Sequence, residues 1–176
     1  MSDYIDQYKV FYDNNGYDNN DPVIRAKNTI EKHIKDTNSN TLMDYGCGLC
    51  THYDKHRVHD QWGITEENLY RYDPAIEKYS VNPDKVFDAV INTDVMEHIP
   101  EPYVDDVIQD IFKHSSKLVY FSIATSPAKA ILPNGENAHC TLKTHQQWCE
   151  RISKFKGNQK VVVETWGRSP GSTILS

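Results

Sequence analysis

At 176 residues the chain is the size of one domain, and its 11 Tyr, 5 Phe and 3 Trp residues supply large apolar side chains for a core. A formal net charge of −6, without any block of Lys and Arg residues, excludes the electrostatic footprint of non-specific nucleic-acid binding. No apolar run reaches the roughly 20 residues that span a bilayer, and the first residues lack the pattern of a signal peptide, so we expect a cytoplasmic protein without a membrane partner.

Two segments precede the first predicted strand. Residues 1–20 are rich in Asn, Asp and Tyr and have no clear period, which indicates a loosely ordered arm, or a short helix whose aromatic residues pack elsewhere as an arm or lid. Apolar residues then recur at steps of three and four from Asp21-Pro22 to about Lys35, and Pro22 follows an Asp cap. Both features predict a helix over this second segment.

Short apolar segments alternate with helical patterns along the rest of the chain. Strands are predicted at 41–45, 68–72, 86–91, 118–123 and 160–165. Helical segments are predicted at 75–79, as a single turn, and at 104–112 and 144–155. Strands that alternate with helices indicate one α/β domain over residues 1–176, with a mostly parallel sheet covered by helices on both faces.

Ligands of open α/β sheets bind beyond the carboxyl ends of the strands, which makes these ends the candidate site: Asp44–Gly48, Asp73, Asn92–Asp94 and Ala124–Ser126. In the first of these, Gly46 and Gly48 allow a sharp turn and a close approach of the backbone to a ligand, and Asp44 can accept a hydrogen bond from a ligand amine. Thr51 stands where a dinucleotide fingerprint has glycine, which disfavours a nicotinamide or flavin cofactor. The alternative is the glycine turn of any α/β protein.

Asp73, the second candidate, ends the next predicted strand, 25 residues after Gly48. At about this spacing the acidic residue of an α/β nucleotide site accepts hydrogen bonds from the two ribose hydroxyls. Asp73-Pro74 is also a turn-initiating pair, so a purely local role for this carboxylate is the alternative.

Polar residues also cluster directly after the third predicted strand, over Asn92–Pro100. The segments LMDYGCG, YRYDP and FDAVINTDVMEHI together resemble the signature of class I S-adenosylmethionine-dependent methyltransferases, in order and approximate spacing over residues 41–123. The later stretch 128–139, with its Asn-Ala-His element, and then Thr141 and Trp148 are similar to small methyltransferase-domain proteins of phages and bacteria.

This resemblance implies a Rossmann-like fold with S-adenosylmethionine as cofactor and methyl donor, and an unidentified methyl acceptor. It implies that the glycine loop follows the methionine part of the cofactor, that Asp73 holds the ribose, and that Asp94-Val95 lies near the methionine or adenine. The cofactor-binding residues are then Asp44, Gly46, Cys47, Gly48, Asp73, Pro74, Asp94 and Val95. Carboxylates and glycine-rich backbone also suit a ligand whose sulfonium and amino groups are cationic.

Two departures separate this chain from the usual family pattern. Cys50 replaces the third glycine of the loop. Between Asp73 and Phe87 there is room for about one helical turn, so the strand and acidic residue that commonly hold adenine are missing or replaced. We therefore expect a trimmed form of the fold, and these departures support one alternative function, a nucleotide-binding module without catalytic activity.

A zinc-stabilised interaction domain is a third hypothesis, because His52, His56 and His59 follow the Cys47-x-x-Cys50 pair. Both thiols lie inside the glycine loop, whose other features fit nucleotide binding. Reduced cysteines and a solvated segment with surface histidines are therefore the preferred interpretation. Packing or surface roles are assigned to Lys143, Trp148 and Trp166.

His98 and His139 are the candidate catalytic residues. Methyl transfer from a sulfonium is an in-line displacement that often requires removal of a proton from the acceptor, and an imidazole can take that proton near neutral pH. The alternatives are a hydrogen-bonding role at a helix start for His98 and a loop-stabilising role for His139. The main hypothesis is thus an enzyme that transfers a methyl group without a metal ion.

Overall fold

The structure is a computed structural model that describes residues 2–15 and 22–175. Its helices and strands are α1 (Ser2–Asn15), α2 (Pro22–Asp36), β1 (Leu42–Tyr45), α3 (Thr51–His56), α4 (Val58–Gln61), β2 (Leu69–Tyr72), β3 (Phe87–Thr93), α5 (Val104–Lys113), β4 (Ser115–Ala124), α6 (His145–Ser153), β5 (Lys160–Trp166) and β6 (Gly171–Leu175). Short 3-10 turns are η1 (Glu66–Asn68), η2 (Glu77–Tyr79), η3 (Met96–His98) and η4 (Glu101–Tyr103). Within the described residues we find no helical segment with the length and apolar character of a transmembrane span.

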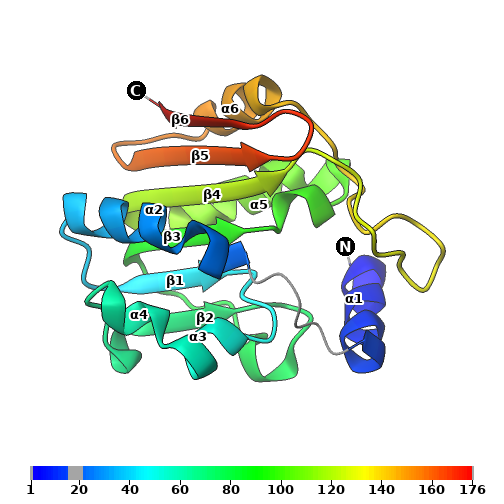
Figure 1. Ribbon diagram of the computed structural model, residues 1–176, viewed down its shortest axis with the longest axis horizontal. Helices are drawn as coiled ribbons and strands as arrows, with labels where there is room; N and C mark the ends of the chain where they lie inside the picture. The colour runs from blue at the N-terminus through cyan, green and yellow to red at the C-terminus, as the bar shows by residue number, and fades with distance from the viewer. Residues whose placement is uncertain (1, 16–21, 176) are drawn as a thin grey trace.

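The strands form one six-stranded sheet in the order β2-β1-β3-β4-β5-β6 (Figure 1). Strands β1 to β5 run parallel, and β6 pairs antiparallel with β5. The predicted mostly parallel sheet is therefore confirmed. Because β2 and β3 lie on opposite sides of β1, the strand order reverses there, and such a switch point opens a crevice beyond the carboxyl ends of the strands.

Helices cover both faces of the sheet, as predicted: α2, α3 and α4 lie on one face, and α5 and α6 on the other (Figure 1). Neighbouring strand residues point to opposite faces, so Leu42 joins the core under α2 whereas Met43 joins the core under α5. Both side chains are fully buried, as are Ile30 in α2 and Ile108 in α5. The sheet is thus a packed platform, and its carboxyl edge carries the loops of the site.

The predicted helices and strands are confirmed to within about three residues. The sharpest boundary is that of α6, where Thr144 and Gln147 form a capping box, each side chain accepting a hydrogen bond from the backbone of the other. The expected Asp21 cap lies outside the described residues. Strand β6 is not among the predicted strands, because its half-exposed residues begin with Gly-Ser and obtain their backbone hydrogen bonds from the edge of β5.

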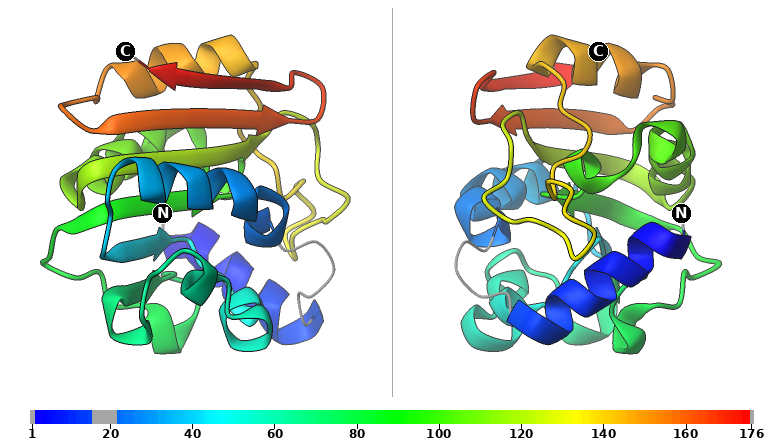
Figure 2. Two further views of the ribbon diagram at one scale, coloured as in Figure 1. Left: turned by 60° about the vertical axis from the view of Figure 1, so that its left-hand side comes forward. Right: turned by 90° about the vertical axis from the view of Figure 1, so that its right-hand side faces the viewer.

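Helix α1 and the segment 125–144 lie side by side across the carboxyl edge of the sheet (Figures 1 and 2). The hydroxyl group of Tyr8 in α1 donates to the backbone carbonyl of Ala138, over 2.9 Å. Of the two interpretations of residues 1–20, the helix with packed aromatic residues is therefore the one found over residues 2–15, and residues 16–20 lie outside the described part of the chain.

Candidate functional site

A cavity of about 940 Å³ lies at the switch point of the sheet, beyond the carboxyl ends of β1, β2 and β3. Its walls are formed by the loops at 44–52, 72–75 and 93–95, by aromatic residues of α1 and by parts of the segment 126–139. Ligand pockets in proteins measure roughly 300–1,000 Å³, so the cavity is large enough for a nucleotide-sized ligand. Every cofactor-binding and catalytic residue predicted from the sequence lines it.

The glycine loop after β1 combines a packing requirement with an opening to the cavity. Gly46 and Gly48 have left-handed backbone conformations, with φ values of +87° and +55°. A Cβ atom on Gly46 would lie 2.4 Å from Cγ2 of Val95. Of the residues that the structure describes, a Cβ atom on Gly48 would approach only Tyr12, whose hydroxyl lies at 3.7 Å. Gly46 is therefore needed for the packing of two loops, and Gly48 leaves the backbone accessible to a ligand.

Cys50, in the position of the third family glycine, also has a left-handed conformation, with a φ of +58°. Its side chain is buried in the core under α2, so the loop keeps a glycine-like turn despite the substitution. Burial raises the pKa of the neighbouring Cys47 thiol well above its ordinary value. Among the described residues, no cluster of metal-ligating groups includes these cysteines or His52, His56 or His59, so the zinc hypothesis gains no support.

Asp44, at the end of β1, is fully buried and lines the cavity. Its Oδ2 atom accepts hydrogen bonds from the Tyr53 hydroxyl, over 2.9 Å, and from Nε2 of His52, over 3.3 Å. Its Oδ1 atom is buried and has no hydrogen-bond partner among the described residues. An unsatisfied buried acceptor costs about 1–3 kcal/mol, and more when it is charged, which makes this atom a candidate acceptor for the donor group of a ligand.

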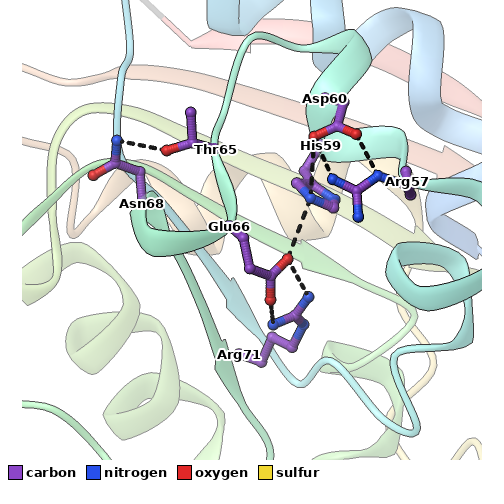
Figure 3. A network of polar contacts seen from close by, with 7 residues as sticks. All are labelled: Arg57, His59, Asp60, Thr65, Glu66, Asn68 and Arg71. Atoms are coloured by element: carbon purple, nitrogen blue, oxygen red, sulfur yellow. Dashed lines mark hydrogen bonds and ion pairs between the residues drawn. The ribbon is translucent and has the colours of Figure 1, made fainter.

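A network of polar contacts joins α4 and its N-cap residue Arg57 to β2 (Figure 3). Arg57 forms an ion pair with Asp60, and Arg71 forms one with Glu66. Burial lowers the pKa of His59, whose ring lies within 3.4 Å of both carboxylates. The Arg71 guanidinium also lies 5.1 Å from the ring centre of Tyr53, the hydrogen-bond donor to Asp44. The predicted solvated segment with surface histidines is wrong for His52 and His59, which are buried because α3 and α4 turn both rings inward onto acidic partners. His56 is exposed, as predicted.

Asp73, at the end of β2, is buried and holds two backbone segments together. Its Oδ2 atom accepts from the N–H of Gly48 and its Oδ1 atom from the N–H of Ala75, each over 2.9 Å. Burial raises the pKa of Asp73, although these two hydrogen bonds oppose the shift. Each carboxylate oxygen has a second lone pair, so the local turn and the binding of ligand hydroxyls are compatible roles for this side chain.

Asp94, after β3, belongs to a cluster that the sequence interpretation misses. Its Oδ1 atom accepts hydrogen bonds from Arg25, over 2.8 Å, and from Nε1 of Trp166, over 3.0 Å. The Arg25 guanidinium lies 4.3 Å from the centre of the Trp166 ring. Trp166 is therefore a cavity residue and not only a packing residue, whereas Trp148 is fully buried and Lys143 forms an ion pair, in line with their assignment.

The two candidate catalytic histidines lie together at one side of the cavity, with ring centres 4.7 Å apart. Nδ1 of His98 lies 2.9 Å from the carbonyl of Ala138, and Nδ1 of His139 lies 2.6 Å from the carbonyl of Ser126. Burial lowers the pKa of His98 to about 3, so its ring is neutral. The predicted hydrogen-bonding and loop-stabilising contacts are thus present, and they leave Nε2 of each ring for another partner.

Glu97 is a third member of this group, and it is not among the predicted site residues. The side chain is fully buried, and its Oε1 atom accepts a hydrogen bond from the N–H of Ala124, over 2.6 Å. Burial, together with the nearby Asp94, raises the pKa of Glu97 well above its ordinary value. The only sequence signal for this residue is the density of Asp, Glu and His after the third strand.

No protein-family model matches the chain, and no curated protein matches it either. The fold and the chemistry of the cavity therefore provide the basis for a function.

Proposed function

We propose that this chain is an S-adenosylmethionine-dependent methyltransferase domain. The main support is the Oδ1 atom of Asp44, which is buried beside a glycine loop at the switch point of a parallel sheet and has no hydrogen-bond partner in the described part of the chain. A carboxylate oxygen in that position favours a ligand with a cationic donor. S-adenosylmethionine combines such a donor, its ammonium group, with a nucleoside of the kind that binds at these switch points.

In this proposal the cofactor binds along the carboxyl ends of β1 and β2. Asp44 accepts from the ammonium group, Asp73 accepts from the ribose hydroxyls, and Gly48 leaves room for the ligand beside the backbone. Asp44 and Asp73 are close enough for the charge of Asp44 to contribute to the raised pKa of Asp73, so a cationic ligand between them relieves their repulsion. The bound cofactor supplies the methyl group, and the chain positions it and excludes water.

The acceptor side of the cavity is assigned to α1 and the segment 126–139. Tyr8, Phe11 and Tyr12 of α1 line the cavity together with His98 and His139. Aromatic rings offer large apolar surfaces with few rotatable bonds, which suits the binding of a flat or apolar part of an acceptor. The imidazole nitrogens beside them can orient the nucleophile, and the ring of His139 can take its proton.

A nucleotide-binding module without catalysis is the second candidate function. Residues 74–86, where the family pattern holds adenine, contain the η2 turn and no strand, which favours a reduced adenine site. This alternative also depends on the missing third glycine of the loop. Because Cys50 keeps a glycine-like turn at that position, the missing glycine no longer supports it. Binding of S-adenosylhomocysteine together with no methyl transfer to any acceptor in a cell extract would favour the module over the enzyme.

Replacement of Asp44 by Asn is expected to weaken binding of S-adenosylhomocysteine by about 10- to 150-fold, because hydrogen bonds to charged groups contribute about 1.5–3 kcal/mol. The control is 5′-methylthioadenosine, which lacks the amino-acid part. Its affinity should be the same for the parent chain and the Asp44→Asn variant, and both dissociation constants can be measured by titration calorimetry. Equal losses for the two ligands would contradict the assignment of Asp44 to the ammonium group.

Asp73→Ala is expected to weaken S-adenosylhomocysteine and 5′-methylthioadenosine alike, because both carry the ribose that Asp73 is proposed to hold. The loss of its hydrogen bonds corresponds to about 1–3 kcal/mol, or about 5- to 150-fold in the dissociation constant. Thermal unfolding of the variant separates this effect from a loosened glycine loop. If Asp73→Ala binds both ligands as the parent chain does, Asp73 is only a turn residue.

A further inference from the structure

The group Glu97, His98 and His139 combines a carboxylate with two imidazoles. One ligand atom from each residue lies within 4.8 Å of those of the other two. The Oε2 atom of Glu97 is buried and has no hydrogen-bond partner among the described residues, and the whole side chain is 0% exposed. A buried oxygen of this kind next to two imidazole rings is energetically unfavourable unless a cation or a hydrogen-bond donor binds it.

The hydrogen bonds of the two imidazole rings orient them as metal ligands. Nδ1 of His98 lies 2.8 Å from the Tyr8 hydroxyl and 2.9 Å from the carbonyl of Ala138. Because the Tyr8 hydroxyl donates its hydrogen to that same carbonyl, and a carbonyl can only accept, the ring hydrogen of His98 is on Nδ1. The contact of Nδ1 of His139 with the carbonyl of Ser126 places its ring hydrogen on Nδ1 as well. The lone pair of each neutral ring is then on Nε2. Metal-binding histidines have this arrangement, in which the second ring nitrogen donates to a carbonyl and fixes the orientation of the ring.

We propose that Glu97, His98 and His139 bind a divalent first-row transition-metal ion. Two imidazoles and one carboxylate suit Zn²⁺, Mn²⁺ and Fe²⁺. Ligand atoms about 2.0–2.2 Å from one ion lie about 3–3.5 Å from one another, which small side-chain rotations can achieve from the present spacing. This site differs from the zinc site considered for the cysteines of the glycine loop, and it departs from the expectation of an enzyme without a metal ion.

Three protein ligands leave coordination positions open on the ion, as in catalytic rather than structural metal sites. His98 and His139 line the cavity, so these positions are accessible from it. An ion there would bind an oxygen or nitrogen atom of the methyl acceptor, a role that rests on the proposed function. The ion site itself does not rest on it, because it follows from the three side chains and their hydrogen bonds.

The test is a Co²⁺ titration of the full chain after a chelator has removed any bound metal. The visible absorption of Co²⁺ reports nitrogen and oxygen ligation. One ion per chain is expected, and Mn²⁺ and Zn²⁺ should compete for the same site. Glu97→Gln keeps the acceptor for Ala124 but removes the anionic ligand, and His139→Ala removes one imidazole from the cavity loop. Each change should weaken binding by more than about 100-fold, since even outer partners of metal ligands contribute about 10- to 100-fold.

The matched control is His56→Ala, which removes an exposed histidine that does not line the cavity and should bind Co²⁺ as the parent does. Circular dichroism establishes whether the variants fold. If the buried Glu97→Gln variant does not fold, His139→Ala provides the test. Absence of binding, unchanged binding in a folded Glu97 or His139 variant, or loss in His56→Ala overturns the proposal. Calorimetry of the metal-free chain with S-adenosylhomocysteine tests the proposed function separately.

Discussion

Replacing Gly46 by alanine is expected to lower the free energy of unfolding by about 2–5 kcal/mol. The new methyl group would lie 2.4 Å from Cγ2 of Val95, and the backbone at Gly46 has a φ of +87°. The left-handed conformation costs a non-glycine residue about 1–2 kcal/mol, and overpacking typically adds about 1–3 kcal/mol. Urea denaturation followed by circular dichroism measures the change.

Gly63 offers a matched control for this prediction. Its φ of +78° is also left-handed, but a Cβ atom on Gly63 would have no neighbour within 4 Å among residues 2–15 and 22–175. Gly63→Ala should therefore carry only the backbone cost of about 1–2 kcal/mol. Val95→Ala removes the clashing methyl groups, so Gly46→Ala should be less destabilising when it is made in that variant. If Gly46→Ala lowers the free energy of unfolding no more than Gly63→Ala does, the Val95 side chain can shift at little energetic cost.

Local patterns were sufficient to predict the five parallel strands of the sheet and a set of residues that line the cavity. The spacing of Val104, Val107, Ile108 and Ile111 marks a helix because one face must be buried, and the structure buries all four side chains in α5. Glycines and acids at the strand ends indicate the cavity because parallel strands bring their carboxyl ends to one edge. These features depend on short stretches of chain and on the rule that relates strands to ligand sites.

The features that were missed depend on contacts between distant segments. Arg25 and Trp166 meet at Asp94 across 69 and 72 residues of sequence, and no local pattern connects them. His59 lies in a polar stretch, and its burial follows only from the way α4 packs. Glu97 resembles any acidic residue of a loop until its surroundings are known, because its burial, and an oxygen with no partner among the described residues, are tertiary properties.

In the metal-free chain, replacing His139 by alanine is expected to reduce methyl transfer by roughly 10²–10⁴-fold if the imidazole is a general base, and by less if it only orients the acceptor. Binding of S-adenosylhomocysteine should change by no more than about 3-fold, which corresponds to less than about 0.7 kcal/mol. The reason is that different residues form the proposed acceptor side and the proposed cofactor side of the cavity. His139 contacts Ser126 and His98 on the proposed acceptor side, whereas Asp44 and Asp73 contact the glycine loop and its flanking residues.

The acceptor must be found first, by incubating a cell extract with S-adenosylmethionine that carries a labelled methyl group and identifying the labelled product. Turnover and cofactor affinity are then measured on the same preparations of the parent chain, His139→Ala and the exposed control His56→Ala. The control should match the parent in both quantities. Asp44→Asn should show the opposite behaviour to His139→Ala, with a large loss of affinity. If His139→Ala loses affinity in proportion to rate, or keeps the full rate, His139 is not on the acceptor side. His98, whose ring lies 4.7 Å away, is then the next candidate.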